Sequence, residues 1–172
     1  MSQNNYLSID LPTEIKHNIL RLQNVILVAD PTFKPYPYDK LHLTLLFMGT
    51  KMAHWKEDKL IKFETFVTNI LQSNKLSIQF DSPVVIKFPP GKENLFVIKY
   101  KPSKDCQTLF ASLHNTLDHE CEFDTWMPHI TLGKTSKQKS DPKLECLGHG
   151  FIGTKILLSG KQRHNRDIEW TI

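Results

Sequence analysis

Two short segments of this 172-residue sequence repeat a pattern of residues that could transfer protons. They are His42-Leu43-Thr44 and His129-Ile130-Thr131, and a leucine follows each of them. In a chain of this composition, chance would produce about 0.1 His-x-Thr matches with an apolar residue both between the histidine and the threonine and directly after the threonine. Two such matches are therefore unexpected. A histidine changes its charge close to neutral pH. One histidine of the pair could therefore act as a base while the other acts as an acid.

Cleavage of a phosphodiester by a neighbouring hydroxyl needs two such proton transfers. One proton leaves the attacking hydroxyl and another is delivered to the leaving oxygen, and each transfer contributes ~10²- to 10⁴-fold in rate. The hydroxyls of Thr44 and Thr131 could donate hydrogen bonds to the non-bridging phosphate oxygens, where negative charge develops. We therefore expect His42, Thr44, His129 and Thr131 to be catalytic, with no metal and no other cofactor. The alternative, two structural histidines, explains one motif better than it explains two.

A bound nucleobase is usually held by stacking on aromatic side chains, worth ~1 to 3 kcal/mol per base. Four aromatic residues lie near the motifs and are candidates for this contact: Phe33, Tyr36, Tyr38 and Trp126. Lys134 follows the second motif and could contact a further phosphate, as could Lys137 and Lys139. The competing interpretations are that the aromatic residues anchor loops and that the lysines form a solvated run.

Both motifs fall in segments with the period-two alternation of a β-strand, at residues 41–45 and 126–132. This period places the histidine and threonine of each motif on one face and the apolar residues on the other, toward the core. Further strands are expected at residues 6–9, 76–80, 84–88, 95–100, 151–158 and 168–172. Helices are expected from about residue 13 to Asp30, from 56 to 71, and from Ser103 to Leu117, because apolar residues recur there every three or four positions. Residues 134–143 are expected to form a mobile loop, and 161–166 a basic turn.

The order of these elements indicates an internal duplication. Each half of the chain runs strand, helix, strand, and each carries its His-x-Thr on the returning strand. We therefore predict an α+β fold with two pseudo-symmetric lobes, in which antiparallel sheets line a central groove and helices cover the outside. Residues 1–172 would form one domain with one active-site groove.

Composition excludes several other classes of protein. Hydrophobic residues make up 40% and charged residues 23%, as is usual in a soluble globular domain. No apolar run is long enough for a membrane span, and no signal peptide is apparent. Three cysteines without CxxC spacing fit a reduced, cytoplasmic protein without zinc. A net charge of +4 is too small for a duplex-DNA binder and suits a small anionic substrate. We expect a monomer that acts on a small nucleotide or oligonucleotide.

The sequence resembles the two-histidine (2H), or LigT-like, phosphoesterase superfamily, whose signature is two His-x-Thr/Ser motifs on strands of two lobes. The similar segments are residues 5–9, 22–27, 41–46 and 128–132, which together span most of the chain. The similarity is greatest to the branch that holds the central domain of an A-kinase anchoring protein and the viral 2′-5′ phosphodiesterases. The resemblance implies that the histidines are acid and base and that the threonines bind phosphate.

The same resemblance implies a substrate class. It points to 2′-5′ phosphodiester bonds in nucleotide second messengers, either 2′-5′ oligoadenylate or 2′-5′-containing cyclic dinucleotides such as cGAMP, and so to a viral protein that evades host antiviral signalling. Two alternatives stay open. One is a 2′,3′-cyclic phosphodiesterase of RNA ends, and the other is a non-catalytic module that binds AMP-like nucleotides. Which histidine is the acid also stays open.

Overall fold

The computed structural model describes residues 4–73, 76–79, 94–117, 121, 126–136, 151–159 and 168–171. Three α-helices lie within these residues: α1 (Thr13–Ala29), α2 (Glu57–Leu71) and α3 (Lys104–Thr116). Two short 3-10 helices are η1 (Tyr38–Lys40) and η2 (Lys51–His54). The described strands are β1 (Asn5–Asp10), β2 (Lys34–Pro35), β3 (His42–Gly49), β4 (Leu76–Gln79), β5 (Asn94–Lys99), β6 (Lys101–Pro102), β7 (His129–Thr135), β8 (Phe151–Gly153), β9 (Lys155–Ser159) and β10 (Ile168–Thr171).

Local sequence explains where the longest helix forms and where it ends. The stripe of Ile15, Ile19, Leu22 and Ile26 is buried along one side of α1, as its three- and four-residue spacing predicts. The amide of Asp30 donates to the carbonyl of Ile26 over 2.7 Å and closes the last turn. Pro31 follows, and a residue that precedes a proline is held away from helical geometry, so the helix stops there.

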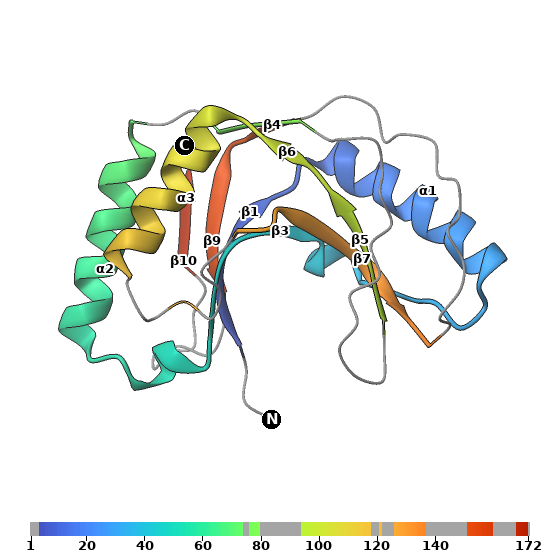
Figure 1. Ribbon diagram of the computed structural model, residues 1–172, viewed down its shortest axis with the longest axis horizontal. Coiled ribbons are helices and arrows are strands. Elements are labelled where there is room, and N and C mark those ends of the chain that lie inside the picture. The colour runs from blue at the N-terminus through green and yellow to red at the C-terminus, as the bar shows by residue number, and fades with distance from the viewer. Residues whose placement is uncertain are drawn as a thin grey trace.

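Strands from both halves of the chain form one antiparallel sheet. Its order is β10-β9-β1-β3-β7-β2, and β5 pairs with β7 as its seventh strand. Figure 1 shows this sheet strongly bent, with β1, β3 and β7 near its middle, α1 on one side and α2 and α3 on the other. A second sheet has the order β6-β4-β8. Helix α1 packs on β2 and β7, and α3 packs on β3, β4 and β6, so each helix covers strands of the other half.

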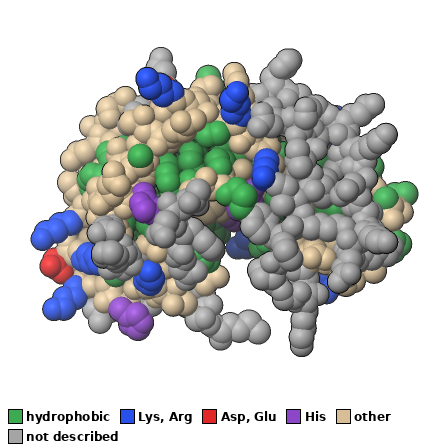
Figure 2. Space-filling view, viewed as in Figure 1, with side chains coloured by type: hydrophobic (Ala, Val, Ile, Leu, Met, Phe, Trp, Pro, Cys, Tyr) green, Lys and Arg blue, Asp and Glu red, His purple; other side chains and the backbone are tan. Residues whose placement is uncertain are grey.

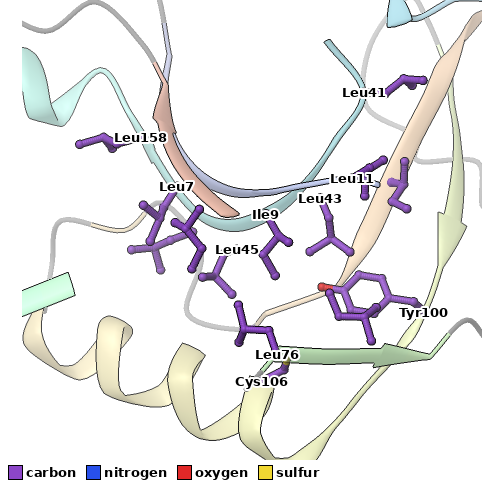
Figure 3. Close-up of a cluster of buried hydrophobic side chains, with 14 of the residues drawn as sticks. Leu7, Ile9, Leu11, Leu41, Leu43, Leu45, Leu76, Tyr100, Cys106 and Leu158 are labelled. Atoms are coloured by element: carbon purple, nitrogen blue, oxygen red, sulfur yellow. The ribbon is translucent and has the colours of Figure 1, made fainter. Parts of the chain in front are cut away.

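The core lies on the side of β1 and β3 that faces α3. Leu7 and Ile9 of β1 and Leu43 and Leu45 of β3 are fully buried, and Figure 3 shows them pointing together toward α3 and Cys106. These are the apolar residues that alternate with the motif residues. Burial of this face fixes the opposite face of β3 as the one that carries His42 and Thr44.

On the surface seen in Figure 2, hydrophobic side chains gather near the centre and Lys and Arg side chains are spread around them. The described part of this surface carries no continuous basic stripe. Among the described residues, no helix has both the length and the apolar character needed to cross a membrane.

The predicted α+β fold is confirmed, with three differences in detail. The two expected sheets are joined through β3 and β7 into one bent sheet, and the smaller sheet is additional. The segment 151–158 is two strands, β8 and β9, which belong to different sheets and are separated at Thr154. Lys134 and Thr135 belong to β7 and not to a loop, because they pair with β5. The predicted strand 84–88, the basic turn 161–166 and most of the loop 134–143 lie outside the described residues.

Candidate active site

The two His-x-Thr motifs lie on neighbouring strands and face the same side of the sheet. Strands β3 and β7 are antiparallel, with Leu43 paired to Ile130, and both of these residues are fully buried in the core. The residues on either side of that pair point to the opposite face. Antiparallel register then sets His42 toward Thr131 and Thr44 toward His129, with paired Cα atoms about 4.5 to 5.5 Å apart. The four predicted catalytic residues form one compact block.

The two imidazoles are held in the same way. Nδ1 of His42 lies 2.7 Å from the carbonyl oxygen of Lys40, and Nδ1 of His129 lies 2.7 Å from that of Met127. In each case the partner is two residues earlier in the chain. A carbonyl oxygen only accepts, so Nδ1 carries the hydrogen in both rings. In the neutral form Nε2 therefore carries the lone pair, and this is the nitrogen that could take a proton from a substrate.

The electrostatic surroundings of His42 favour its neutral form. Desolvation by burial is the main cause that lowers the pKa of His42 below its ordinary value. Two groups raise the pKa of His42 and so oppose the effect of burial: the carbonyl of Lys40, which accepts a hydrogen bond from the ring, and the carboxylate of Asp10. The charges of His129 and Lys16 lower the pKa further. The effect of His129 also indicates that the two imidazoles share one site.

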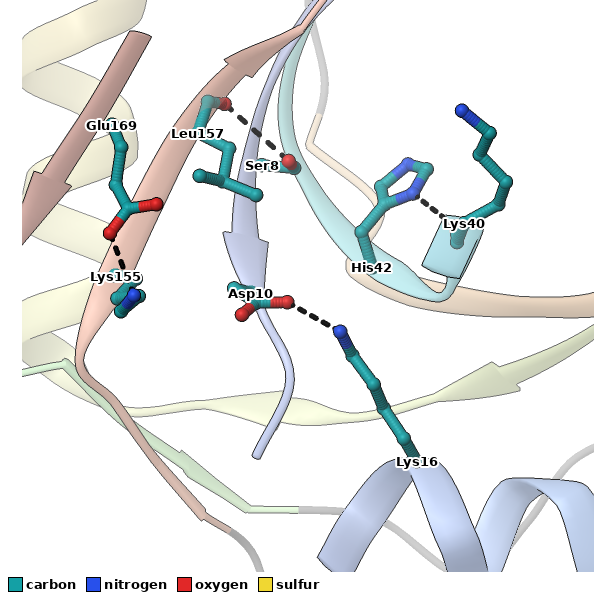
Figure 4. A network of polar contacts seen from close by, with 8 residues as sticks. All are labelled: Ser8, Asp10, Lys16, Lys40, His42, Lys155, Leu157 and Glu169. Carbon is teal, nitrogen blue, oxygen red and sulfur yellow. Dashed lines mark hydrogen bonds and ion pairs between the residues drawn. The ribbon is translucent and has the colours of Figure 1, made fainter. Parts of the chain in front are cut away.

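Groups on β1 and α1 support His42 from one side. The ring of Tyr6 stacks on the imidazole, with 4.6 Å between ring centroids and 15° between planes. Asp10 is the residue of β1 paired with His42, and its carboxylate accepts a hydrogen bond from Nζ of Lys16 over 2.7 Å. Figure 4 shows this pair beside the His42–Lys40 hydrogen bond. Neither Tyr6 nor Asp10 is among the site residues predicted from the sequence.

A β-bulge follows each motif at the same offset. On β3 the register passes from Thr44 to Leu46 and leaves Leu45 as the extra residue. On β7 it passes from Thr131 to Gly133 and leaves Leu132. The first seven residues of each strand accordingly share one alternation of half-buried and buried positions, with two buried residues in succession at the bulge.

The bulges return one further residue of each strand to the groove face. An extra residue in one strand shifts the side-chain alternation beyond it. Phe47 of β3 and Lys134 of β7, each five residues after its histidine, are the half-buried residues placed in this way. Lys134 was predicted at the site. Phe47 was missed, although its equal offset from the motif histidine is a signal that could have found it.

The predicted aromatic residues occupy different environments. Tyr38 is 37% exposed, and its ring lies 5.7 Å from that of His17 and 5.5 Å from Nζ of Lys16. Trp126 lies beside the first motif, because its indole nitrogen donates to the carbonyl of Thr44 over 3.2 Å. One face of this indole is covered by Phe110, with 5.0 Å between centroids and 10° between planes. The ring of Tyr100 also packs against this indole in a T-shaped arrangement, with 6.0 Å between centroids and 75° between planes.

The loop that carries Tyr36 is fastened to β7. The side-chain amide of the buried Gln23 donates to the carbonyls of Tyr36 and Leu132, over 2.9 and 2.7 Å. The Tyr36 amide also donates to Leu132, over 2.8 Å. Phe33, at the start of the loop, is 3% exposed and packs edge-on against Phe96. The prediction that Phe33 stacks on a base is therefore wrong, since its ring belongs to the core.

The described residues include no group of three or more His, Cys, Asp or Glu side chains that could hold a metal ion. Cys106 and Cys121 are free thiols. What the site offers is two imidazoles with matched hydrogen bonds, two hydroxyls, and a face lined by aromatic and basic side chains. This set can move protons and bind an anionic oxygen.

Comparison with known proteins supports the fold. No family model matches this sequence. A protein of Acinetobacter phage Ac42, the anti-CBASS protein Acb1, is 25% identical over 138 residues, which make up 80% of this chain and 77% of that protein. Crystal structures of E. coli LigT are similar throughout. The complex with 3′-AMP aligns with a TM-score of 0.70 and 19% identity, over 100% of this chain and 99% of LigT.

The MHV ns2 PDE domain is also similar in structure. It aligns with a TM-score of 0.60 and 16% identity, and the match covers 94% of this chain and all, 100%, of that domain. At these identities the likeness to solved structures is one of fold. The LigT-like fold predicted from the resemblance is confirmed.

Proposed function

We propose that this chain, which has the fold and both histidine motifs of the two-histidine phosphoesterases, is a metal-independent phosphodiesterase. The observation that carries the proposal is the matched pair of imidazoles. His42 and His129 lie on adjacent antiparallel strands, and each is oriented through Nδ1 by the carbonyl two residues before it. Each also has a threonine of the other motif as its neighbour, a placement that a structural pair of histidines would not require.

The roles of the two histidines follow from their surroundings. Burial lowers the pKa of His42, so its Nε2 is unprotonated near neutral pH and suits a general base. His129 then acts as the acid. For a 2′-5′ linkage, the free 3′-hydroxyl attacks phosphorus while His42 takes its proton. The bond to the 5′-oxygen breaks, His129 gives that oxygen a proton, and a 2′,3′-cyclic phosphate remains.

The threonines and the flanking residues bind the substrate in this proposal. Hydroxyls of Thr44 and Thr131 donate to the non-bridging oxygens, where each such donor contributes about 10²- to 10³-fold in rate. Tyr36, Tyr38 and Trp126 stack on bases, and Lys134 binds phosphate. The placement of Lys134 on the groove face by the β7 bulge supports its part.

Nucleotide signals are the substrate class that the comparisons favour. The phage relative is an anti-CBASS protein and the ns2 domain is a PDE domain. Both support the cleavage of cyclic nucleotide signals. Within that class we propose 2′-5′ linkages, in 2′-5′ oligoadenylate or in a cyclic dinucleotide. The protein would then counter an immune response that depends on a nucleotide messenger.

A second candidate is a 2′,3′-cyclic phosphodiesterase of RNA ends, with water as the nucleophile. The LigT structure in complex with 3′-AMP favours it, because a nucleoside monophosphate is the product of that reaction. A groove that only sequesters nucleotides is the non-catalytic alternative. Turnover separates it from both enzymes.

One experiment decides among these functions. The protein is incubated with 2′-5′ oligoadenylate, cyclic dinucleotides and 2′,3′-cyclic AMP in excess EDTA, and products are resolved by chromatography and mass spectrometry. We expect 2′-5′ bonds to be cut with a 2′,3′-cyclic end as first product, and expect activity to persist in EDTA. A 3′-deoxy 2′-5′ oligoadenylate should bind but resist cleavage, because it lacks the nucleophile. Ready cleavage of the deoxy compound, or loss of activity that divalent ions restore, would refute the mechanism.

We also propose that the chain is a single domain that works as a monomer in the cytoplasm. The packing of α1 on β7 and of α3 on β3 and β4 supports one domain, since each of these helices covers strands of the other half. The free thiols of Cys106 and Cys121 support a reducing compartment.

A further inference from the structure

The two halves place oppositely charged residues at equivalent positions beside the two histidines. Asp10 of β1 is paired with His42 of β3, and Lys99 of β5 is paired with His129 of β7. Directly opposed residues of an antiparallel pair project from the same face. Asp10 and Lys99 are therefore the neighbours of the two imidazoles on the groove face, related by the pseudo-symmetry of the lobes.

The two charges differ in how they are satisfied. The carboxylate of Asp10 is paired with Nζ of Lys16 at 2.7 Å, so the β1–β3 side of the groove carries a neutralised pair. In the segments that the structure describes, no carboxylate forms an ion pair with Lys99, although Lys99 is half-buried. An ammonium that has no carboxylate partner is available to pair with an anionic ligand. Next to a site built for one phosphate, that ligand is a second anionic group.

The strand neighbours of Lys99 support an anion on this side. Val97, two residues before it, is opposite Thr131 and is fully buried, yet it does not belong to the main core cluster. It therefore forms an apolar floor beside the motif on the groove side. Such a floor lowers the local dielectric constant and strengthens the attraction between an ammonium and a phosphate.

We propose that Lys99 is a specificity-determining residue that binds a second phosphate of the substrate, on the nucleotide that leaves. The placement of this second phosphate on the leaving nucleotide rests on the proposed function. There His129 protonates the departing 5′-oxygen, so the leaving nucleotide lies on the side of His129 and Lys99. The preferred substrate then has a phosphate or phosphodiester beyond the bond that is cut, as oligonucleotides and cyclic dinucleotides have and 2′,3′-cyclic mononucleotides lack. Phe47 and Tyr6, on the β1–β3 side, face the nucleoside that retains the cyclic phosphate.

Three synthetic dinucleotides test this placement. The first is adenylyl-(2′-5′)-adenosine, the second carries an added 2′-phosphate on the leaving adenosine, and the third carries a 5′-phosphate on the attacking adenosine instead. We expect kcat/KM for the second dinucleotide to be about tenfold higher than for the first, because a charge-assisted hydrogen bond is gained. The difference should come from a lower KM. The third should be no better than the first.

Variants of Lys99 supply the controls. Lys99→Met keeps the side-chain stem and removes the charge, and it should abolish the advantage of the second dinucleotide over the first. Lys99→Arg should restore the advantage. Lys101→Met, at an exposed position of β6, is the matched control and should behave as the wild type.

A binding measurement keeps this inference separate from the proposed function. The same three ligands without the attacking 3′-hydroxyl are titrated by calorimetry. If no dinucleotide is cleaved, the proposed function fails. The inference about Lys99 is still supported if the second ligand binds more tightly than the first and if Lys99→Met removes this difference in affinity. Equal affinity for all three ligands, an advantage that survives Lys99→Met, or a preference for the third ligand would overturn the proposal.

Discussion

Each of the two candidate catalytic histidines owes its orientation to a backbone neighbour as much as to its own chemistry. The carbonyls of Lys40 and Met127 accept the Nδ1 hydrogens of His42 and His129, and so determine which nitrogen can take part in proton transfer. These carbonyls come from two residues earlier, so a short stretch of chain contains both the group and its orienter. The environment then differentiates two otherwise similar histidines, because burial, Tyr6 and the Asp10–Lys16 pair act on His42.

Removal of either imidazole should abolish turnover without unfolding the protein. His42→Ala and His129→Ala each delete one proton carrier, and each should lower kcat/KM by about 10²- to 10⁴-fold. The double variant should be scarcely worse, because the two groups act in one step. Steady-state kinetics measures the loss, and thermal unfolding checks the fold. Wild-type rates in either single variant would contradict the two-histidine mechanism.

The pH dependence should report the environment of His42. Its pKa is lowered by burial, so the acidic limb of the kcat/KM profile, where the base becomes protonated, should lie below the ordinary histidine value of 6.5. Asp10→Asn removes a charge that raises this pKa and should move the limb to still lower pH. Asp58→Asn, at an exposed position in the first turn of α2 and not among the charges that act on His42, should leave it in place. An acidic limb above 6.5 would rule out His42 as the buried base.

The same shift has a consequence for stability. The pKa of His42 is lower in the folded than in the unfolded state, so between these two values the unfolded chain binds more protons. The contribution of His42 to the free energy of unfolding should therefore fall as pH decreases below about 6.5, the unfolded value.

At the scale of elements, the groove depends on two bulged strands and on a loop fastened to one of them. The bulges bring Phe47 and Lys134 to the groove face, and Gln23 ties the loop of Tyr36 to β7. Gly133 lies at the bulge of β7, where β2 pairs with it through Pro35. A β-carbon at Gly133 would lie 2.4 Å from the carbonyl oxygen of Lys34 and 2.5 Å from the ring of Phe33.

Gly133→Ala should therefore destabilise the protein. The nearest atom is backbone, so the loop must move away from β7, at a cost of about 1 to 3 kcal/mol for overpacking. We expect a lower Tm and weaker nucleotide binding, because the loop leads to Tyr36 and Tyr38. Thermal denaturation measures the effect. The control variant is Thr154→Ala, at an exposed position between β8 and β9. An unchanged Tm would show that the loop is not held at this contact.

At the scale of the whole molecule, the active site exists only because the two halves pair. Strands β3 and β7 come from different halves and meet at Leu43 and Ile130, and α1 and α3 each cover strands of the opposite half. The catalytic block is thus assembled from residues almost ninety positions apart, the interval between His42 and His129. Folding of either half alone would leave its apolar strand face uncovered.

The chain should consequently unfold in one cooperative transition. Calorimetric and van't Hoff enthalpies should agree, and circular dichroism and tryptophan fluorescence should give coincident melting curves. A fragment that ends at residue 73 should lack stable structure, because it contains α1 without β7, and β3 without the strand that pairs with it across the two halves. Two separate transitions would overturn the single-domain proposal.

The sequence by itself indicated the three helices, the longer strands among the described residues and the four catalytic candidates. Those features depend on local periodicity, and in β3 and β7 the alternation alone places histidine and threonine opposite the core leucines. It also indicated the fold class, because the order of elements repeats. The roles of the two histidines were left open, since local sequence does not reveal how deeply a side chain is buried.

Only the tertiary structure decided the bulges, the pairing across the two halves and the burial of individual aromatic rings. Phe47 reaches the groove and Phe33 the core because of register and packing between residues distant in sequence, which no local pattern encodes. The opposition of Lys99 to His129, and of Asp10 to His42, arises in the same way. The two-residue alternation in the sequence predicts which side chains share a face of one strand. The partner strand and its register, in contrast, are set by the packing of the whole core.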